Sequence, residues 1–169
     1  SSLTLSLRAD IKQKEARYNS AIQMNKLLEM ADEEAAGMLD LVIPDREGNE
    51  VSLSALKGKV ILVSFWASGS DASIQAMLQL KSTYQKYHSQ GFEIYAISLD
   101  NNKINWMNDL DYNEFEWINV SELSFPESKA SLYYNVTSIP TSFLINRDGD
   151  IVAKNLYGRN LETWLDNLI

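Results

Sequence analysis

The sequence contains no cysteine and only one histidine, His88. The absence of cysteine excludes disulfides, thiolate chemistry and cysteine-ligated zinc within this chain. Because thiolate and imidazole are common ligands of tightly bound transition metals, we expect no metal site and no cofactor. Cysteine usage often indicates the redox compartment of a protein, and here it gives no such information.

Basic residues and long apolar runs are also scarce. The 15 lysines and arginines are outnumbered by 23 aspartates and glutamates, so the net charge is -8 and the pI is near 4.6. This balance argues against a nucleic-acid partner, which would require clustered lysine and arginine. No apolar run approaches the roughly 20 residues of a membrane span. The opening SSLTLSLRAD lacks the basic start and apolar core of a signal peptide, so we predict neither feature in this chain.

A chain of 169 residues, 45% of them hydrophobic, is long enough for one ordinary core. We expect residues 1–36 to form a helical segment or linker, and residues 37–169 to form the compact domain. Residues 9–35 lack proline and glycine and are rich in helix formers. A helix leading into the domain is the simpler interpretation, and a partner-binding or dimerisation helix is the alternative.

The pattern of the compact part is typical of an α/β protein. VILVSFWA (60–67) and FEIYAISL (92–99) are near-continuous apolar runs, as in strands buried on both faces. Residues 71–89 between them have helical spacing, so these segments predict a strand–helix–strand unit. The remaining expected elements are a turn at 45–49, short helices near 103–110 and 127–134, a hairpin of strands 141–146 and 150–157, and an amphipathic helix over 160–168.

The stretch FWASGSDAS (65–73) joins the first buried strand to the predicted helix. Ser70 is a favoured N-cap, Asp71 suits the positive end of the helix dipole, and Ser73 could accept first-turn N–H bonds. Helix capping alone is the simpler interpretation of these residues. A serine-lined recognition site is the alternative.

Catalysis by these serines is not expected. A helix terminus contributes roughly 0.3–1 kcal/mol, less than one pKa unit, whereas a hydroxyl has a pKa of roughly 15–16. A serine nucleophile therefore needs an adjacent base. His88 lies near the far end of the same predicted helix, on the order of 27 Å away at a rise of about 1.5 Å per residue.

Two other patterns have simple structural interpretations. Residues 146–150 (NRDGD) superficially resemble a calcium loop, but their ligand spacing fails and a hairpin turn is expected instead. The acidic residues of the following set show no ligand periodicity and are expected on the solvated surface: Asp100, Asp109, Asp111, Glu114 and Glu116.

Several motifs in order resemble the TlpA/ResA-like thiol-disulfide oxidoreductases of the thioredoxin superfamily, which are related to AhpC/TSA. They are DREGNEVSLSALKGKVILVSFWAS, GFEIYAISLD and YYNVTSIPTSFLINRDGDIVAKNLYG. The resemblance covers about residues 37–169. It implies an α/β thioredoxin-like fold with a central mixed β-sheet flanked by helices, here with an N-terminal helical extension.

The resemblance fails where the chemistry of that family is located. The family carries a tryptophan or similar residue and then Cys-x-x-Cys at the start of the helix, where Gly69, Ser70 and Ser73 stand here. The positions of its following glutamate and proline hold Ala76 and Leu78. Because these parts are missing together, we interpret the pattern as natural loss of redox chemistry and not as a double serine substitution.

Ile139-Pro140-Thr141 occupies the position of the family's cis-proline loop. In that family the backbone of the residue before the proline, here Ile139, pairs with an extended substrate segment. The surface could still bind a peptide or protein by strand-like hydrogen bonding, or Pro140 could be retained for folding alone. The expected binding residues are Trp66, Gly69, Ser70, Asp71, Ser73, Ile139 and Pro140.

Two functional hypotheses follow. The favoured one is a redox-inactive thioredoxin-like domain that acts as a binding or accessory module, with a protein or peptide in the groove beside Pro140. The alternative is a TlpA/ResA-type thiol-disulfide oxidoreductase whose active-site cysteines are absent from this chain. The resemblance also implies an extracytoplasmic setting, at a bacterial periplasm or cell surface.

Overall fold

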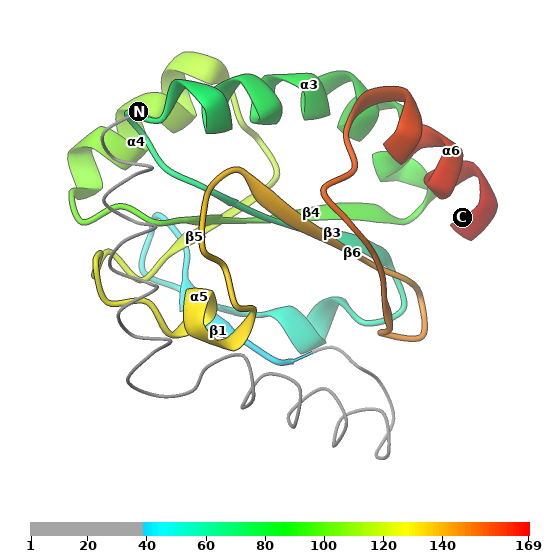
Figure 1. Ribbon diagram of the computed structural model, residues 1–169, viewed down its shortest axis with the longest axis horizontal. Helices are drawn as coiled ribbons and strands as arrows, with labels where there is room; N and C mark the ends of the chain where they lie inside the picture. Colours follow the sequence, from blue (N-terminus) through cyan, green and yellow to red (C-terminus); the bar gives the residue numbers. More distant parts are fainter. Residues whose placement is uncertain (1–38) are drawn as a thin grey trace.

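The structure is a computed structural model that describes residues 39–169. The helix expected over residues 9–35 lies outside the described residues. In the described part, a five-stranded sheet has the order β5-β4-β3-β6-β7, and a separate pair of short strands, β1 and β2, lies beside it (Figure 1). The mixed sheet with flanking helices confirms the predicted thioredoxin-like fold class.

The centre of the sheet is formed by β3 (Val60–Trp66) and β4 (Phe92–Ser98), which run parallel. Every residue of both strands is buried, as their continuous apolar runs predicted. On one side, β5 (Ile118–Ser121) pairs in parallel with β4. On the other side, β6 (Thr141–Ile145) pairs antiparallel with β3, and β7 (Ile151–Lys154) pairs antiparallel with β6.

Helices cover both faces of the sheet. Figure 1 shows α3 (Asp71–Tyr87), α4 (Lys103–Asn113) and α6 (Gly158–Leu168) above the sheet, and α5 (Lys129–Tyr133) below it with β1. A short 3₁₀ helix, η2 (His88–Gln90), extends α3. The two faces form two separate hydrophobic clusters because successive residues of a strand point to opposite sides.

The alternation along β3 shows this division. Leu62 and Trp66 pack in the cluster with α3, α4 and α6, whereas Val63 and Phe65 pack in the cluster with α5 and the β1–β2 hairpin. That hairpin consists of β1 (Val42–Pro44) and β2 (Glu50–Ser52), and the 3₁₀ helix η1 (Leu53–Leu56) follows it.

The region between residues 100 and 138 differs from the sequence expectation in one respect. The two predicted short helices are present as α4 and α5, but the strand β5 between them was not predicted. Its four residues, INVS, are too few and too polar to form a recognisable strand pattern. This strand matters below because it forms one edge of the sheet.

Candidate functional site

The strand-to-helix corner lies between the end of β3 at Trp66 and the start of α3 at Asp71. Ser70 is the N-cap of α3, and its Oγ accepts a hydrogen bond from the backbone N–H of Ser73 at 3.4 Å. Gly69 turns the chain with φ +81°, a left-handed conformation that glycine adopts without strain. The predicted capping role of Ser70 is therefore confirmed.

Ser73 is fully buried and stabilises the corner in a way that was not predicted. Its Oγ lies 3.2 Å from the Ala67 nitrogen, from which it accepts, and its own proton faces two carbonyl oxygens, of Ala67 at 3.2 Å and Ser70 at 3.1 Å. The expectation that it would accept first-turn N–H bonds was wrong. The side chain turns back to the corner, where it accepts from the Ala67 N–H and where the Ala67 carbonyl oxygen also accepts from the Ser70 N–H.

A third group at the corner, Asp100, was wrongly expected on the solvated surface. Asp100 is 7% exposed, and its carboxylate accepts hydrogen bonds from three groups. The Ser68 hydroxyl donates to Oδ1 at 2.5 Å, the Ser68 N–H lies 3.2 Å from both carboxylate oxygens, and the Ser98 hydroxyl donates to Oδ2. These donors make burial of the carboxylate tolerable.

The position of Asp100 could have been inferred from the register of the sheet. In the parallel pair β3–β4, Trp66 lies opposite Ser98. Ser68 lies two residues after Trp66, and Asp100 lies two residues after Ser98. The segments that follow the two strands therefore leave the sheet side by side at the same edge. The sequence feature that indicated its burial was an acidic residue shortly after a buried parallel strand. This residue was grouped with the acidic residues that follow and so was assigned to the surface.

The loop before β6 lies beside this corner. The Ile139–Pro140 peptide bond is cis, as the resemblance implied. The antiparallel register pairs Phe65 with Thr141, so the two residues before Thr141 lie next to the end of β3. Ile139 is 3% exposed, and Pro140 is half-buried. The structure therefore brings the cis-proline loop and the corner together.

The seven expected binding residues are thus adjacent in space, but they differ in exposure. Four of them are buried, namely Trp66, Ser70, Ser73 and Ile139, whereas Pro140 is half-buried and Gly69 and Asp71 are exposed. The serine side chains form the interior of the corner and do not line an open recognition surface. A partner at this place would contact Gly69, Asp71 and Pro140 first.

His88 lies at the other end of α3, as expected. Its ring stacks on Tyr84 with 4.5 Å between the centroids, and its Nδ1 is 3.2 Å from the Phe92 carbonyl oxygen. It therefore cannot act as a base for either serine. In residues 39–169, no group of three or more histidine, aspartate or glutamate side chains is placed to hold a metal, and no helix is long and apolar enough to cross a membrane.

The comparisons with known proteins agree with this geometry. The model of the family described as thioredoxin-like matches residues 58–151. Thiol-disulfide oxidoreductase ResA of Bacillus cereus is 32% identical over 120 residues, which are 68% of this chain and 65% of that relative. The ResA protein of Bacillus subtilis is 28% identical over 113 residues, which are 67% of this chain and 62% of that relative. The chain therefore spans less than two thirds of the length of these relatives.

Solved structures agree as well. A thiol-disulfide oxidoreductase from Bacteroides fragilis superposes with a TM-score of 0.73 at 26% identity, over 80% of this chain and 99% of that chain. A thioredoxin-like protein from Bacteroides vulgatus has a TM-score of 0.64 at 36% identity, over 78% and 83% of the two chains. With the family model matching more than half of its residues, the chain belongs to the thioredoxin-like family, in which the ResA-type thiol-disulfide oxidoreductases are its relatives.

Proposed function

We propose that this chain is a thioredoxin-like domain that has lost dithiol chemistry and acts as a binding or accessory module for an extended polypeptide segment. The observation that carries the proposal is the state of the two cysteine-equivalent positions. Ser70 and Ser73 are fully buried; Oγ of Ser70 accepts from the Ser73 N–H, and the Ser73 hydroxyl lies within hydrogen-bond distance of the Ala67 and Ser70 carbonyl oxygens.

The chemistry of the relatives requires an atom that this chain lacks. Thiol–disulfide exchange proceeds by attack of a thiolate on a disulfide sulfur, and the attacking chain is oxidised when its second thiol displaces the product. A serine hydroxyl stays protonated near neutral pH and cannot form the mixed disulfide. Asp71, in the first turn of α3, would also repel a thiolate at position 70.

The cis-proline loop supports the binding role. In residues 39–169, the backbone N–H and C=O of Ile139 make no hydrogen bond by the usual distance and angle criteria. Backbone groups without a partner beside a sheet are the groups that an added strand uses. An extended segment pairing with Ile139 would pass over the exposed Gly69, where a bulky residue would narrow the approach.

A redox assay tests the loss of chemistry. We expect background rates when the chain is incubated with insulin and a reductant, and turnover above background would contradict the proposal. The double variant Ser70→Cys/Ser73→Cys should show weak activity at most, because Asp71 remains and Ala76 replaces the family's glutamate. Activity at the level of an authentic ResA protein would show that the loss is confined to the two sulfur atoms.

A titration tests the binding role. Reduced, carboxymethylated α-lactalbumin is a permanently unfolded polypeptide and serves as the probe for ¹⁵N-labelled protein. We expect saturable shifts of the Ile139, Gly69 and Thr141 amides, with the far end of α3 unchanged. Uniform small shifts, or none at these amides at the highest soluble probe concentration, would contradict a peptide-binding role at the loop.

The alternative hypothesis rests on the names of the relatives, which are thiol-disulfide oxidoreductases. The coding sequence of the native gene decides between the two, because cysteine codons at positions 70 and 73 would establish the alternative. We also propose an extracytoplasmic setting by resemblance to the TlpA/ResA group. Fractionation of cells that express the tagged gene tests this, and a purely cytosolic product would contradict it.

A further inference from the structure

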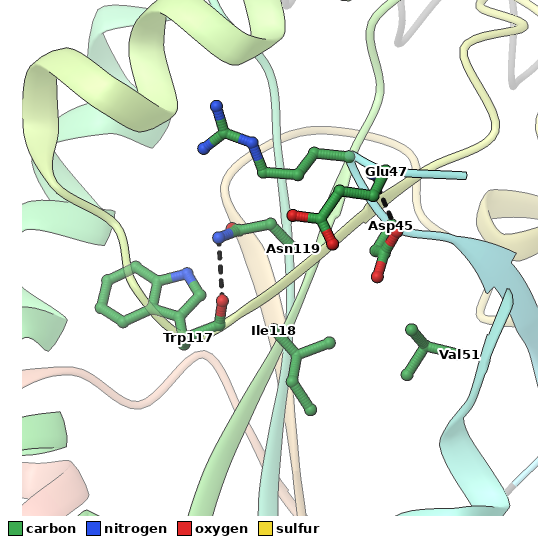
Figure 2. A pocket seen from close by; sticks show the side chains of 7 residues that line it. Asp45, Glu47, Val51, Trp117, Ile118 and Asn119 are labelled. Carbon is green, nitrogen blue, oxygen red and sulfur yellow. Dashed lines mark hydrogen bonds between the residues drawn. The ribbon is translucent and has the colours of Figure 1, made fainter. Parts of the chain in front are cut away.

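A second place in the molecule has the properties of a binding site, away from the corner. A cavity of about 220 Å³ lies where the β1–β2 hairpin approaches the edge strand β5 (Figure 2). Seven residues line it: Asp45, Arg46, Glu47, Val51, Trp117, Ile118 and Asn119. None of them belongs to the corner or to the cis-proline loop.

The cavity exists because the hairpin covers the edge of the sheet incompletely. Among residues 39–169, β5 pairs with β4 on one side and is the last strand of the sheet. On its other side, an isolated antiparallel bridge joins Asp45 to Val120. Beyond this bridge the hairpin diverges from the strand, and the space beside residues 117–119 stays open.

The charge at the rim is negative. Asp45 and Glu47 lie side by side on the hairpin (Figure 2), and within the described residues neither forms a salt bridge. Arg46 also lines the cavity and is attracted by Glu47, but its guanidinium forms its salt bridge with Asp111, at 2.9 Å. That hydrogen bond raises the pKa of Arg46 and lowers the pKa of Asp111.

Within the described residues, two buried polar atoms of the lining residues have no hydrogen-bond partner, Oδ1 of Asn119 and the indole Nε1 of Trp117. Asn119 is 8% exposed, and its Nδ2 donates to the carbonyl oxygens of Phe115 at 2.8 Å and Trp117 at 2.9 Å. These two bonds fix the orientation of the amide, and no group in residues 39–169 donates a hydrogen bond to Oδ1. In the view of Figure 2, the amide lies between Trp117 and the carboxylate of Glu47. A buried carbonyl oxygen of this kind calls for a donor.

We propose that this cavity receives a basic side chain, lysine or arginine, from a partner polypeptide. The apolar side chains of Val51 and Ile118 suit its aliphatic stem, and the carboxylates of Asp45 and Glu47 suit its charged head. The head group also supplies a donor for Oδ1 of Asn119 after a small local adjustment. The open edge of β5 lets the partner backbone run alongside, as in strand addition.

Other kinds of occupant fit less well. An anion would be repelled by two carboxylates, and an apolar side chain would leave the buried Asn119 oxygen without a donor. The chain as a whole carries a net charge of -8, which favours encounter with a basic partner. The inference does not depend on peptide binding at the corner.

The test uses short peptides and the complete chain. Acetyl-Gly-Lys-Gly-amide is titrated into ¹⁵N-labelled protein, and acetyl-Gly-norleucine-Gly-amide serves as the uncharged probe of similar length. We expect saturable shifts of the Asn119 side-chain amide and the Trp117 indole N–H with the lysine peptide only. Affinity should fall as salt is raised, because the rim charges are screened.

Variants separate this site from general electrostatics. The double variant Asp45→Asn/Glu47→Gln keeps the acceptors of the hairpin turn and should weaken lysine-peptide binding about 5- to 10-fold. Glu50→Gln removes an exposed carboxylate from the same hairpin that does not line the cavity, and it should have little effect. Equal shifts with both peptides, no saturation, or equal weakening in the two variants would overturn the proposal.

Discussion

Replacement of Asp100 by asparagine is the most direct test of how the corner is held. The buried carboxylate accepts from the Ser68 N–H, the Ser68 hydroxyl and the Ser98 hydroxyl. Asparagine keeps one acceptor oxygen and places an NH₂ group where the second oxygen was. The two hydroxyls can rotate and accept from this group, but the Ser68 N–H cannot, so at least one buried donor is weakened or left unpaired.

The expected cost follows from these contacts. A hydrogen bond to a charged group contributes about 1.5–3 kcal/mol, and an unsatisfied buried donor costs about 1–3 kcal/mol. Removal of a buried charge offsets part of this loss because its desolvation penalty disappears. We therefore expect Asp100→Asn to lower the free energy of unfolding by about 2 kcal/mol, which corresponds to a fall of about 4–8 °C in Tm.

Urea unfolding followed by tryptophan fluorescence measures this change, and Asp71→Asn is the matched control. Asp71 is exposed in the first turn of α3, so its loss should cost only about 0.3–1 kcal/mol. A double-mutant cycle of Asp100→Asn with Ser68→Ala should show a coupling energy of at least about 0.5 kcal/mol. If Asp100→Asn costs no more than Asp71→Asn, or the cycle shows no coupling, the carboxylate does not hold the corner.

Two further predictions concern regions away from the corner. Gly91→Ala should destabilise the domain by more than Gly48→Ala, although both glycines have positive φ (99° and 87°). The added Cβ at position 91 would lie 2.9 Å from the Arg147 guanidinium and would displace it from the carbonyl oxygens of Gly58 and Gln90, whereas no described residue lies close to a Cβ at position 48. Urea midpoints compare the two, and the difference should vanish in an Arg147→Ala background; persistence of the difference there would contradict the steric explanation. Burial raises the pKa of Tyr95 and Tyr134 above the ordinary value of about 10, so their contribution to stability is complete below about pH 10 and is lost as the pH rises further. The urea midpoint should therefore fall above about pH 10, less steeply in Tyr95→Phe, and an unchanged slope in this variant would refute the assignment.

The framework of the fold was accessible from the sequence because its strongest signals are local. The strands β3 and β4 are buried on both faces, which makes them uninterrupted apolar runs that stand out in any window. The strand β5 was not accessible in this way. Its polar Asn119 and Ser121 break the apolar run, although both are buried in the fold. The Ser121 hydroxyl donates to the Ser98 carbonyl oxygen of β4, and the Asn119 amide donates to the nearby carbonyl oxygens of Phe115 and Trp117.

The features of the candidate site also differ in whether they depend on local neighbours or on distant contacts. The capping role of Ser70 depends on a neighbour three residues away, and the sequence alone predicts it. The burial of Asp100 depends on a contact with Ser68 across 32 positions, which only the strand register supplies. The cavity beside β5 could not be predicted from the sequence. Asp45 was already explained as a turn residue, and the strand β5 opposite it was not predicted.

The position of β3 in the sheet order has a consequence for the chain during its synthesis. One neighbour, β4, follows soon after β3, but the other, β6, emerges only after the whole region of α4, β5 and α5 has been made. Until then, the apolar segment VILVSFW has one open hydrogen-bonding edge, which is the kind of strand that pairs with other copies and aggregates. Chains that end before residue 141 should therefore aggregate more readily than the complete domain, in which β6 covers that edge of β3.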